Sequence, residues 1–183
     1  MDCPAIGREE DLAWLKTTGG DRLLIGQPGS GKTFLLRLLT HAGQALFVIS
    51  RDRGEVAAGI RAQEPAVLIV DDAHMETELL TNLMQLRSSM GAEFNIVATC
   101  WPGDCDRVQA VLAIPDEQTR ELAPMPRVQI GKVVGAIEPR LANWVVGEIV
   151  DQAEGRPGAG PRCLPKLNSG WYRDWAAQPG NGR

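Results

Sequence analysis

Residues 26–33 are the part of the chain best suited to bind phosphate. They read Gly-Gln-Pro-Gly-Ser-Gly-Lys-Thr and match the pattern G-x-x-x-x-G-K-[ST] at every fixed position. Glycines let successive backbone N–H groups turn toward an anion, and the positive end of a following helix would face the same place. In this pattern Lys32 neutralises β- and γ-phosphates, while the Thr33 hydroxyl ligates Mg²⁺. The residues predicted to bind the nucleotide here are Gly26, Gln27, Pro28, Gly29, Ser30, Gly31, Lys32, Thr33 and Phe34.

A pair of acidic residues follows an apolar run of the chain. Val67–Val70 leads into Asp71 and Asp72, and the carboxyl ends of parallel strands are where such sheets bind ligands. We expect Asp71 to hold Mg²⁺ together with Thr33, directly or through water. Asp72 is the candidate general base for an attacking water, with Lys32 as a second catalytic residue. An Asp-Asp pair at a strand end can also cap the next helix, and the two roles are compatible.

Apolar runs alternate with helix-like segments along most of the chain. The predicted strands are 22–26, 45–50, 66–70, 94–99 and 119–122. The predicted helices are 8–16, 32–40, 55–63, 76–90 and 104–112, followed after Pro124 by 127–137 and 141–153. Because the strands lack polar alternation, they predict an α/β fold with a parallel sheet covered by helices on both faces.

The strand predicted at 45–50 lies between the phosphate-binding motif and the acidic pair. A strand inserted there is typical of the additional-strand class of P-loop NTPases, with a parallel five-stranded sheet in the order 5-1-4-3-2. In that order the fourth strand neighbours the first, so Thr99 at its end would lie beside the phosphate-binding loop. Thr99 is therefore a third catalytic candidate, able to sense a γ-phosphate or orient water. A strand-end threonine can also simply satisfy local backbone groups.

The chain divides into three predicted parts. They are a P-loop NTPase core at 1–124, a partial helical lid at 125–157 and a tail at 158–183. Gly155 and Pro157 end the last predicted helix. The tail is rich in glycine and proline, so we expect it to be poorly ordered.

The overall composition is that of a globular protein. Of 183 residues, 44% are apolar and 23% are charged, and 19 Lys and Arg against 23 Asp and Glu give a net charge of −4. These figures exclude a coiled coil, a collagen-like chain and wholesale disorder. The basic residues are dispersed, so nothing indicates direct nucleic-acid binding. No apolar run reaches the roughly 20 residues of a membrane span, and the four cysteines lack zinc-site spacing, so we expect a cytoplasmic protein.

Taken together, the motifs resemble those of the STAND branch of AAA-type ATPases, in particular the nucleotide domains of prokaryotic members. The resemblance covers about residues 5–158 and rests on Ile6-Gly7-Arg8-Glu9, GQPGSGKT, VLIVDDAH, IVATCWP, ELAP and GRPG. It implies that Ile6 to Arg8 pack near the adenine and that Pro157 touches the bound nucleotide. It also implies that ATP/ADP exchange acts as a switch for assembly or signalling. Many related ATPases carry Glu where this chain has Asp72, so slow hydrolysis is expected.

The resemblance leaves three functions open. The first is an ATPase switch that self-associates or acts on an effector or regulatory protein. The second is a non-catalytic, nucleotide-binding remnant of a larger switch, because the sequence after Gly158 does not resemble lid helices and reads as truncated or frameshifted. The third is a small P-loop kinase acting on a metabolite. The absence of a guanine-reading N-K-x-D sequence favours ATP over GTP.

Several residues near the motifs carry weaker expectations. Arg51, Arg53 and Arg107 are candidates for an arginine finger without support from spacing, and an exposed arginine is more often simply solvated. His74 follows the acidic pair and could face the γ-phosphate, but a lone histidine is more often a loop residue that shields the site, which is the expectation here. Trp101 is expected to pack against the sheet edge, although such a residue can also stack on a partner.

Overall fold

The computed structural model describes residues 5–17, 19–41, 43 and 45–158. The chain forms two compact units, the first ending at Ala123 and the second beginning at Pro124. From residue 159 onward, the predicted tail lies outside the described residues.

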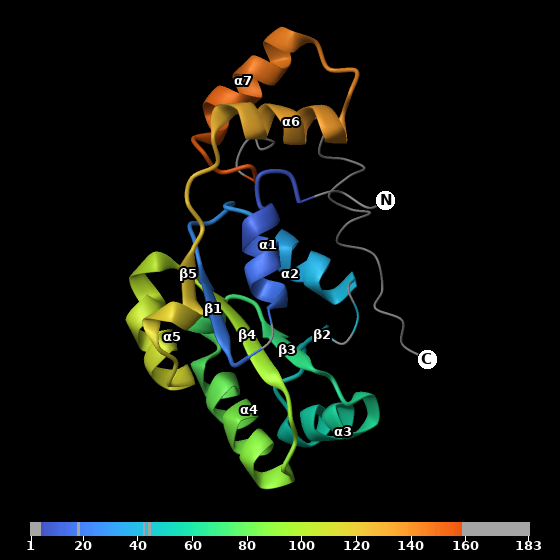
Figure 1. Cartoon of the computed structure of the whole chain (residues 1–183), viewed down its shortest axis with the longest axis vertical. Coiled ribbons are helices and arrows are strands. Elements are labelled where there is room, and N and C mark those ends of the chain that lie inside the picture. The colour runs from blue at the N-terminus through green and yellow to red at the C-terminus, as the bar shows by residue number, and fades with distance from the viewer. Residues whose placement is uncertain (1–4, 18, 42, 44, 159–183) are drawn as a thin grey trace. The chain divides into compact units, whose positions relative to one another are not determined.

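The first unit is built on a five-stranded sheet in which every pairing is parallel (Figure 1). The strands are β1 (Arg22–Ile25), β2 (Ala45–Phe47), β3 (Val67–Val70), β4 (Asn95–Cys100) and β5 (Thr119–Glu121). They lie in the order β2-β3-β4-β1-β5, which confirms the predicted order 5-1-4-3-2. β4 therefore lies between β1, which leads into the phosphate-binding loop, and β3, which leads into the acidic pair.

Helices cover both faces of this sheet, as the sequence predicts. The helices of the first unit are α1 (Glu9–Lys16), α2 (Lys32–His41), α3 (Arg53–Gln63), α4 (Thr77–Met90) and α5 (Cys105–Leu112). The shorter 3₁₀ turns are η1 (Ala73–Met75), η2 (Pro102–Asp104) and η3 (Asp116–Gln118). Because alternate strand residues face opposite sides, Leu24 packs into one core with α1 and α2, while Leu23 and Ile25 pack into the other with α3, α4 and α5.

Most element boundaries lie within two residues of the sequence prediction, and two of the differences concern α3 and β2. The helix predicted from residue 55 begins at Arg53, because the Asp52 side chain accepts a hydrogen bond from the Glu55 N–H at 2.8 Å and so caps it. The strand predicted at 45–50 ends at Phe47. It lies at the edge of the sheet with β3 as its partner, and beyond that pairing Ile49 is 95% exposed.

A partly buried ion pair fixes the start of β1 against β4. The Asp21 carboxylate accepts hydrogen bonds from both terminal nitrogens of Arg87, at 2.7 and 2.8 Å, and from the Ile96 N–H at 2.7 Å. Arg87 lies on α4 and Ile96 on β4, so one carboxylate joins three elements. This network sets the register in which β1 presents the loop at its other end.

The second unit contains a pair of helices, α6 (Arg127–Ile137) and α7 (Asn143–Ala153). They pack through a small core of Met125, Ile130, Val150 and Ala153. The Met125 N–H donates to the Gly155 carbonyl at 2.7 Å, so the segments before α6 and after α7 are joined. Gly155 has a φ of 79°, and a Cβ there would lie 2.7 Å from Pro124 Cβ, so this close approach requires glycine.

Within the described part of the chain, no helix combines the length and the apolar character needed to cross a lipid bilayer.

Candidate functional site

The loop between β1 and α2 has the backbone geometry that phosphate binding requires. Gly29 and Gly31 adopt φ values of 81° and 100°, in the region that glycine tolerates best. Gly26 lies against the inside of the loop, and a Cβ there would meet Ser30 Oγ at 2.5 Å. The Ser30 N–H donates to the Gln27 carbonyl at 3.1 Å, which closes the turn.

The residues predicted to bind the nucleotide in this loop differ in their exposure to solvent. Gly26, Ser30 and Lys32 are buried, Gln27, Pro28 and Gly29 are exposed, and Gly31, Thr33 and Phe34 are half-buried. The middle of the loop is therefore exposed to solvent, while the side chains of Ser30 and Lys32, which could contact phosphate, are buried.

Lys32 lies at that base. Its Nζ donates hydrogen bonds to the carbonyl oxygens of Gly26 at 2.7 Å and Gln27 at 3.3 Å. Burial lowers the pKa of Lys32 because it removes water from the ammonium, and the charges of Asp72 and Asp71 partly oppose that shift. The ammonium is therefore incompletely solvated, which favours its interaction with an incoming anion.

The Asp71 carboxylate joins the phosphate-binding loop to the neighbouring strand. Thr33 Oγ1, at the start of α2, donates to Asp71 Oδ2 at 2.6 Å. Thr99 Oγ1, near the end of β4, donates to Asp71 Oδ1 at 2.6 Å. Both carboxylate oxygens are thus held by hydroxyl groups, which fixes the plane and direction of the side chain.

Asp72 is exposed and has an unusual backbone conformation. Its φ of 49° lies in the left-handed region, which aspartate tolerates better than most residues. The Asp72 N–H donates to Thr99 Oγ1 at 2.9 Å and lies 3.2 Å from Asp71 Oδ1. Thr99 therefore contacts both acids, and it positions them from inside the sheet, where it is fully buried.

These residues fit a magnesium–nucleotide complex. Ser30 Oγ is buried and has no hydrogen-bond partner among the described residues, so the loop holds a free hydroxyl at its base. The Thr33 hydroxyl and the Asp71 carboxylate are hard oxygen ligands of the kind that Mg²⁺ prefers. No group of three or more His, Cys, Asp and Glu side chains that could hold a metal occurs in the described residues. Mg²⁺ needs no such cage, because it usually binds one or two carboxylates together with phosphate oxygens.

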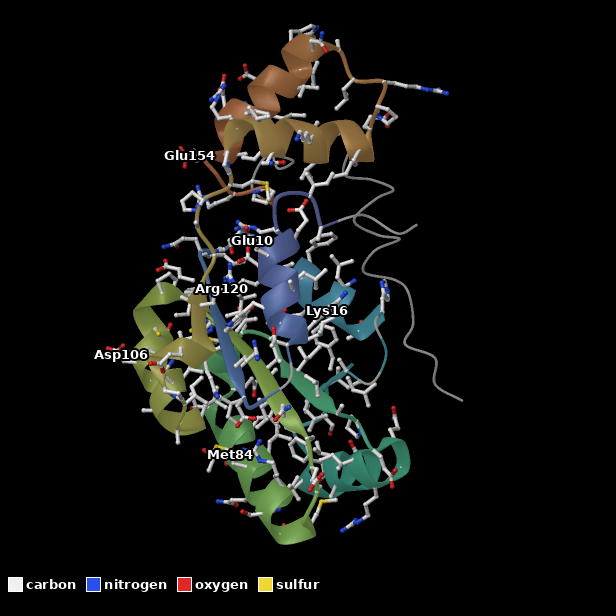
Figure 2. All side chains as sticks on the ribbon, viewed as in Figure 1. Glu10, Lys16, Met84, Asp106, Arg120 and Glu154 are labelled. Atoms are coloured by element: carbon white, nitrogen blue, oxygen red, sulfur yellow. The ribbon has the colours of Figure 1, made fainter. Side chains whose placement is uncertain are left out.

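Arg8 contacts the phosphate-binding loop from below. It is buried, and one terminal nitrogen donates to the Ser30 carbonyl at 3.2 Å and to the Ala123 carbonyl at 2.8 Å. Arg8 also pairs with Asp11, which pairs in turn with Arg120 of β5 at 2.8 Å. Arg120 points toward α1 in Figure 2. Arg8 is predicted as a site residue from the resemblance to STAND ATPases, but its contact with the loop backbone could not be predicted from the sequence.

The remaining predicted residues have other local surroundings. Ile6 is half-buried in the segment before α1. Pro157 is half-buried in the second unit, after α7. Arg51 pairs with Glu76, and Arg53 donates to the Gln85 side chain at 2.9 Å. Their roles toward a nucleotide stay predictions.

No protein-family model and no curated protein matches the chain. Its fold is similar to solved structures. Cdc6p from Pyrobaculum aerophilum is 16% identical with a TM-score of 0.64, over 96% of this chain and 64% of that one. A RuvB variant from Thermotoga maritima is 18% identical with a TM-score of 0.62, over 86% of this chain and 58% of that one.

A third similar structure is a Signal Transduction ATPase with Numerous Domains that has a tetratricopeptide repeat sensor, from Pyrococcus horikoshii. It is 14% identical with a TM-score of 0.50, over 83% of this chain and 28% of that one. The chain thus spans less than two thirds of each of these three proteins. At these identities the likeness establishes the fold, which is that of the P-loop NTPases.

Replacing Thr99 by Val tests whether the Thr99 hydroxyl holds both Asp71 and Asp72. The change keeps the shape but removes the hydroxyl, which leaves the Asp72 N–H and one Asp71 oxygen with fewer partners. We expect the free energy of unfolding to fall by about 2 kcal/mol, measured by urea denaturation. Thr81→Val is the matched control, because the Thr81 hydroxyl bonds the Thr77 carbonyl on the exposed face of α4. Equal losses of unfolding free energy in the two variants would contradict this role of the Thr99 hydroxyl.

Proposed function

We propose that this chain is a nucleotide-binding module that binds ATP with Mg²⁺, hydrolyses it slowly and uses ATP/ADP exchange as a conformational or assembly switch. The observation that carries the proposal is the Asp71 carboxylate, bonded at 2.6 Å both to Thr33 of the phosphate-binding loop and to Thr99 of β4. That arrangement brings the expected metal ligands and a strand-end polar group together, and the charge of Asp71 acts on the Lys32 ammonium.

The loop would bind the phosphates of ATP through its backbone and Lys32. Gly29 and Gly31 turn the backbone so that its N–H groups can face an anion. Lys32 would exchange its bonds to the Gly26 and Gln27 carbonyls for bonds to phosphate oxygens, which are stronger because both partners are charged. The Ser30 hydroxyl, which lacks a partner among the described residues, is a further donor at the base of the loop.

The metal would be held by Thr33 and Asp71. Their side chains lie within hydrogen-bond distance of each other, so the two sets of ligand oxygens are adjacent. When bound, Mg²⁺ supplies neutralisation of the charge that develops on the phosphates during transfer. Thr99 would keep the Asp71 carboxylate in the orientation that the site requires.

Asp72 would act as the general base. It is exposed at the carboxyl end of β3, next to Asp71, and Thr99 holds its backbone N–H. Its charge raises the pKa of Lys32 against the larger effect of burial, which supports a role of the two groups in one site. Because its side chain is one methylene shorter than glutamate, it reaches less far toward a water, and we expect turnover to be slow.

The finer assignments follow the resemblance to STAND ATPases. Ile6 and Arg8 would lie near the adenine, α6 and α7 would form part of a lid, and Pro157 would touch the bound nucleotide. The partners would be a second copy of the chain or an effector or regulatory protein, in the cytoplasm. Support comes from the P-loop fold, which the chain shares with a STAND protein, and from the contact of Arg8 with the phosphate-binding loop.

Lys32→Ala tests nucleotide binding. Removing the ammonium deletes charge-assisted bonds to phosphate, so we expect ATP affinity to fall about 100-fold in isothermal titration calorimetry. Lys16→Ala, at the exposed end of α1, is the matched control and should leave the affinity unchanged. Unchanged affinity in the Lys32 variant would contradict the proposed site.

Asp72→Asn separates binding from hydrolysis. The amide cannot accept the proton of an attacking water, so we expect phosphate release to fall about 100-fold while ATP affinity stays within about twofold. Asp106→Asn is the control, because Asp106 is exposed on α5 and points away from the sheet (Figure 2). Equal phosphate release in the two proteins would contradict the role of Asp72 as general base, and no release from either would favour a chain that binds ATP without hydrolysing it.

A further inference from the structure

Arg107 of α5 contacts the turn that carries Asp72. One of its terminal nitrogens donates to the backbone carbonyl of His74 at 2.8 Å and to Asp104 Oδ1, also at 2.8 Å. His74 lies in η1, the 3₁₀ turn that directly follows Asp72, and η1 packs against β4, α4 and α5. A side chain from one helix thus bonds the backbone of the turn next to the candidate general base.

The turn itself is short and closed on Asp72. The Met75 N–H donates to the Asp72 carbonyl at 2.9 Å, so a shift of the turn moves Asp72 with it. On its other side, the Asp72 N–H is held by Thr99 Oγ1 of β4. The left-handed backbone of Asp72 is therefore fixed between two supports, Thr99 inside the sheet and Arg107 on the neighbouring helix.

The His74 ring supplies a second contact to the same connection. The ring packs on Trp101, which immediately follows β4, with centroids 4.7 Å apart and planes tilted by 39°. His74 is only 7% exposed, and neither ring nitrogen has a hydrogen-bond partner among the described residues. Buried imidazole nitrogens without partners lower stability, so hydrogen bonding does not explain this ring in the described state. Its contribution here is an apolar contact with the tilted indole ring.

We propose that the connection from Trp101 to Arg107 is a brace that positions the Asp72 carboxylate within its own chain. Arg107 holds the turn through the His74 carbonyl, and Trp101 holds it through the His74 ring. Arg107 is then a positioning residue and not an arginine finger acting on another copy. The inference deepens the proposed ATP hydrolysis and rests on it.

Because Arg107 is exposed, its loss can affect the position of Asp72 without affecting the stability of the fold. The side chains of Arg107 and Asp104 are 57% and 30% exposed, and ion pairs of that kind add little to stability. Losing the Arg107 side chain should therefore leave the fold nearly unchanged. A small displacement of a catalytic group can nevertheless slow a reaction by one or two orders of magnitude.

The first experiment compares Arg107→Ala with Arg107→Lys and with Arg61→Ala, a control on the exposed face of α3. We expect Arg107→Ala to lower kcat about tenfold, with the Kd for ATP within about twofold and Tm within about 2 °C. Arg107→Lys should recover part of kcat, because an ammonium can still donate to the His74 carbonyl. Equal kcat in Arg107→Ala and Arg61→Ala would overturn the brace.

Mixing two variants tests whether Arg107 acts on its own chain. Arg107→Ala chains retain Asp72, and Asp72→Asn chains retain Arg107. If Arg107 were a finger acting between copies, a mixture would form sites that contain both residues and would regain activity. We expect the mixture to show only the summed activity of its parts, and recovery above that sum would overturn the proposal.

Two substitutions at His74 test the stacking contact. His74→Phe keeps a flat ring against Trp101 and removes the unpartnered nitrogens, so we expect kcat within about twofold and Tm that does not fall. His74→Ala removes the ring and should lower kcat severalfold at unchanged Kd for ATP. If Phe lowers kcat as much as Ala does, the ring nitrogens act directly and stacking is the wrong explanation.

Hydrogen exchange tests the brace independently of hydrolysis. In Arg107→Ala we expect the amides of residues 72–76 to exchange at least severalfold faster, while those of 29–33 keep their rates. Unchanged exchange at 72–76 would overturn the brace, whether or not the chain hydrolyses ATP. Faster exchange in a chain that releases no phosphate would instead show that the brace exists and that the proposed hydrolysis is wrong.

Discussion

The candidate site depends on the Asp71 carboxylate and the two hydroxyls that hold it. Strand order explains why they meet: β4 lies between β3 and β1, so Thr99 stands between the acid that ends β3 and the loop that follows β1. Thr33 closes the arrangement from the first turn of α2. A sheet with another order would separate these three side chains, even with the same motifs in the sequence.

The charges around this carboxylate favour a divalent cation. Asp71 and Asp72 are adjacent in the chain, and the ammonium of Lys32, a residue of the loop itself, donates to backbone carbonyls. The pKa of Lys32 is lowered by burial and raised less by the two acids, so desolvation has the larger effect on its charge. A divalent cation would neutralise the charge of the two acids, and a phosphate bound to that cation would neutralise the charge of Lys32.

Much of this arrangement could be predicted from the sequence. Apolar strands without polar alternation predicted the parallel sheet, and the inserted strand at 45–50 predicted the order of its strands. That order in turn predicted that Thr99 lies beside the phosphate-binding loop. What Thr99 contacts could not be predicted, because a hydroxyl at a strand end can face an acid, a backbone group or a ligand. The contacts of Arg8 and Arg107 with backbone carbonyls are equally invisible in a sequence, since a carbonyl has the same chemistry at every position.

The effect of magnesium on ATP affinity, measured in the unaltered chain and in Asp71→Asn, tests the central claim most directly. Calorimetric titrations with and without Mg²⁺ give that effect for each protein at one pH and ionic strength. If Asp71 holds the metal, Mg²⁺ should raise the affinity of the unaltered chain about tenfold or more and raise that of the variant by less than about twofold. The same increase in both proteins would contradict the role assigned to Asp71.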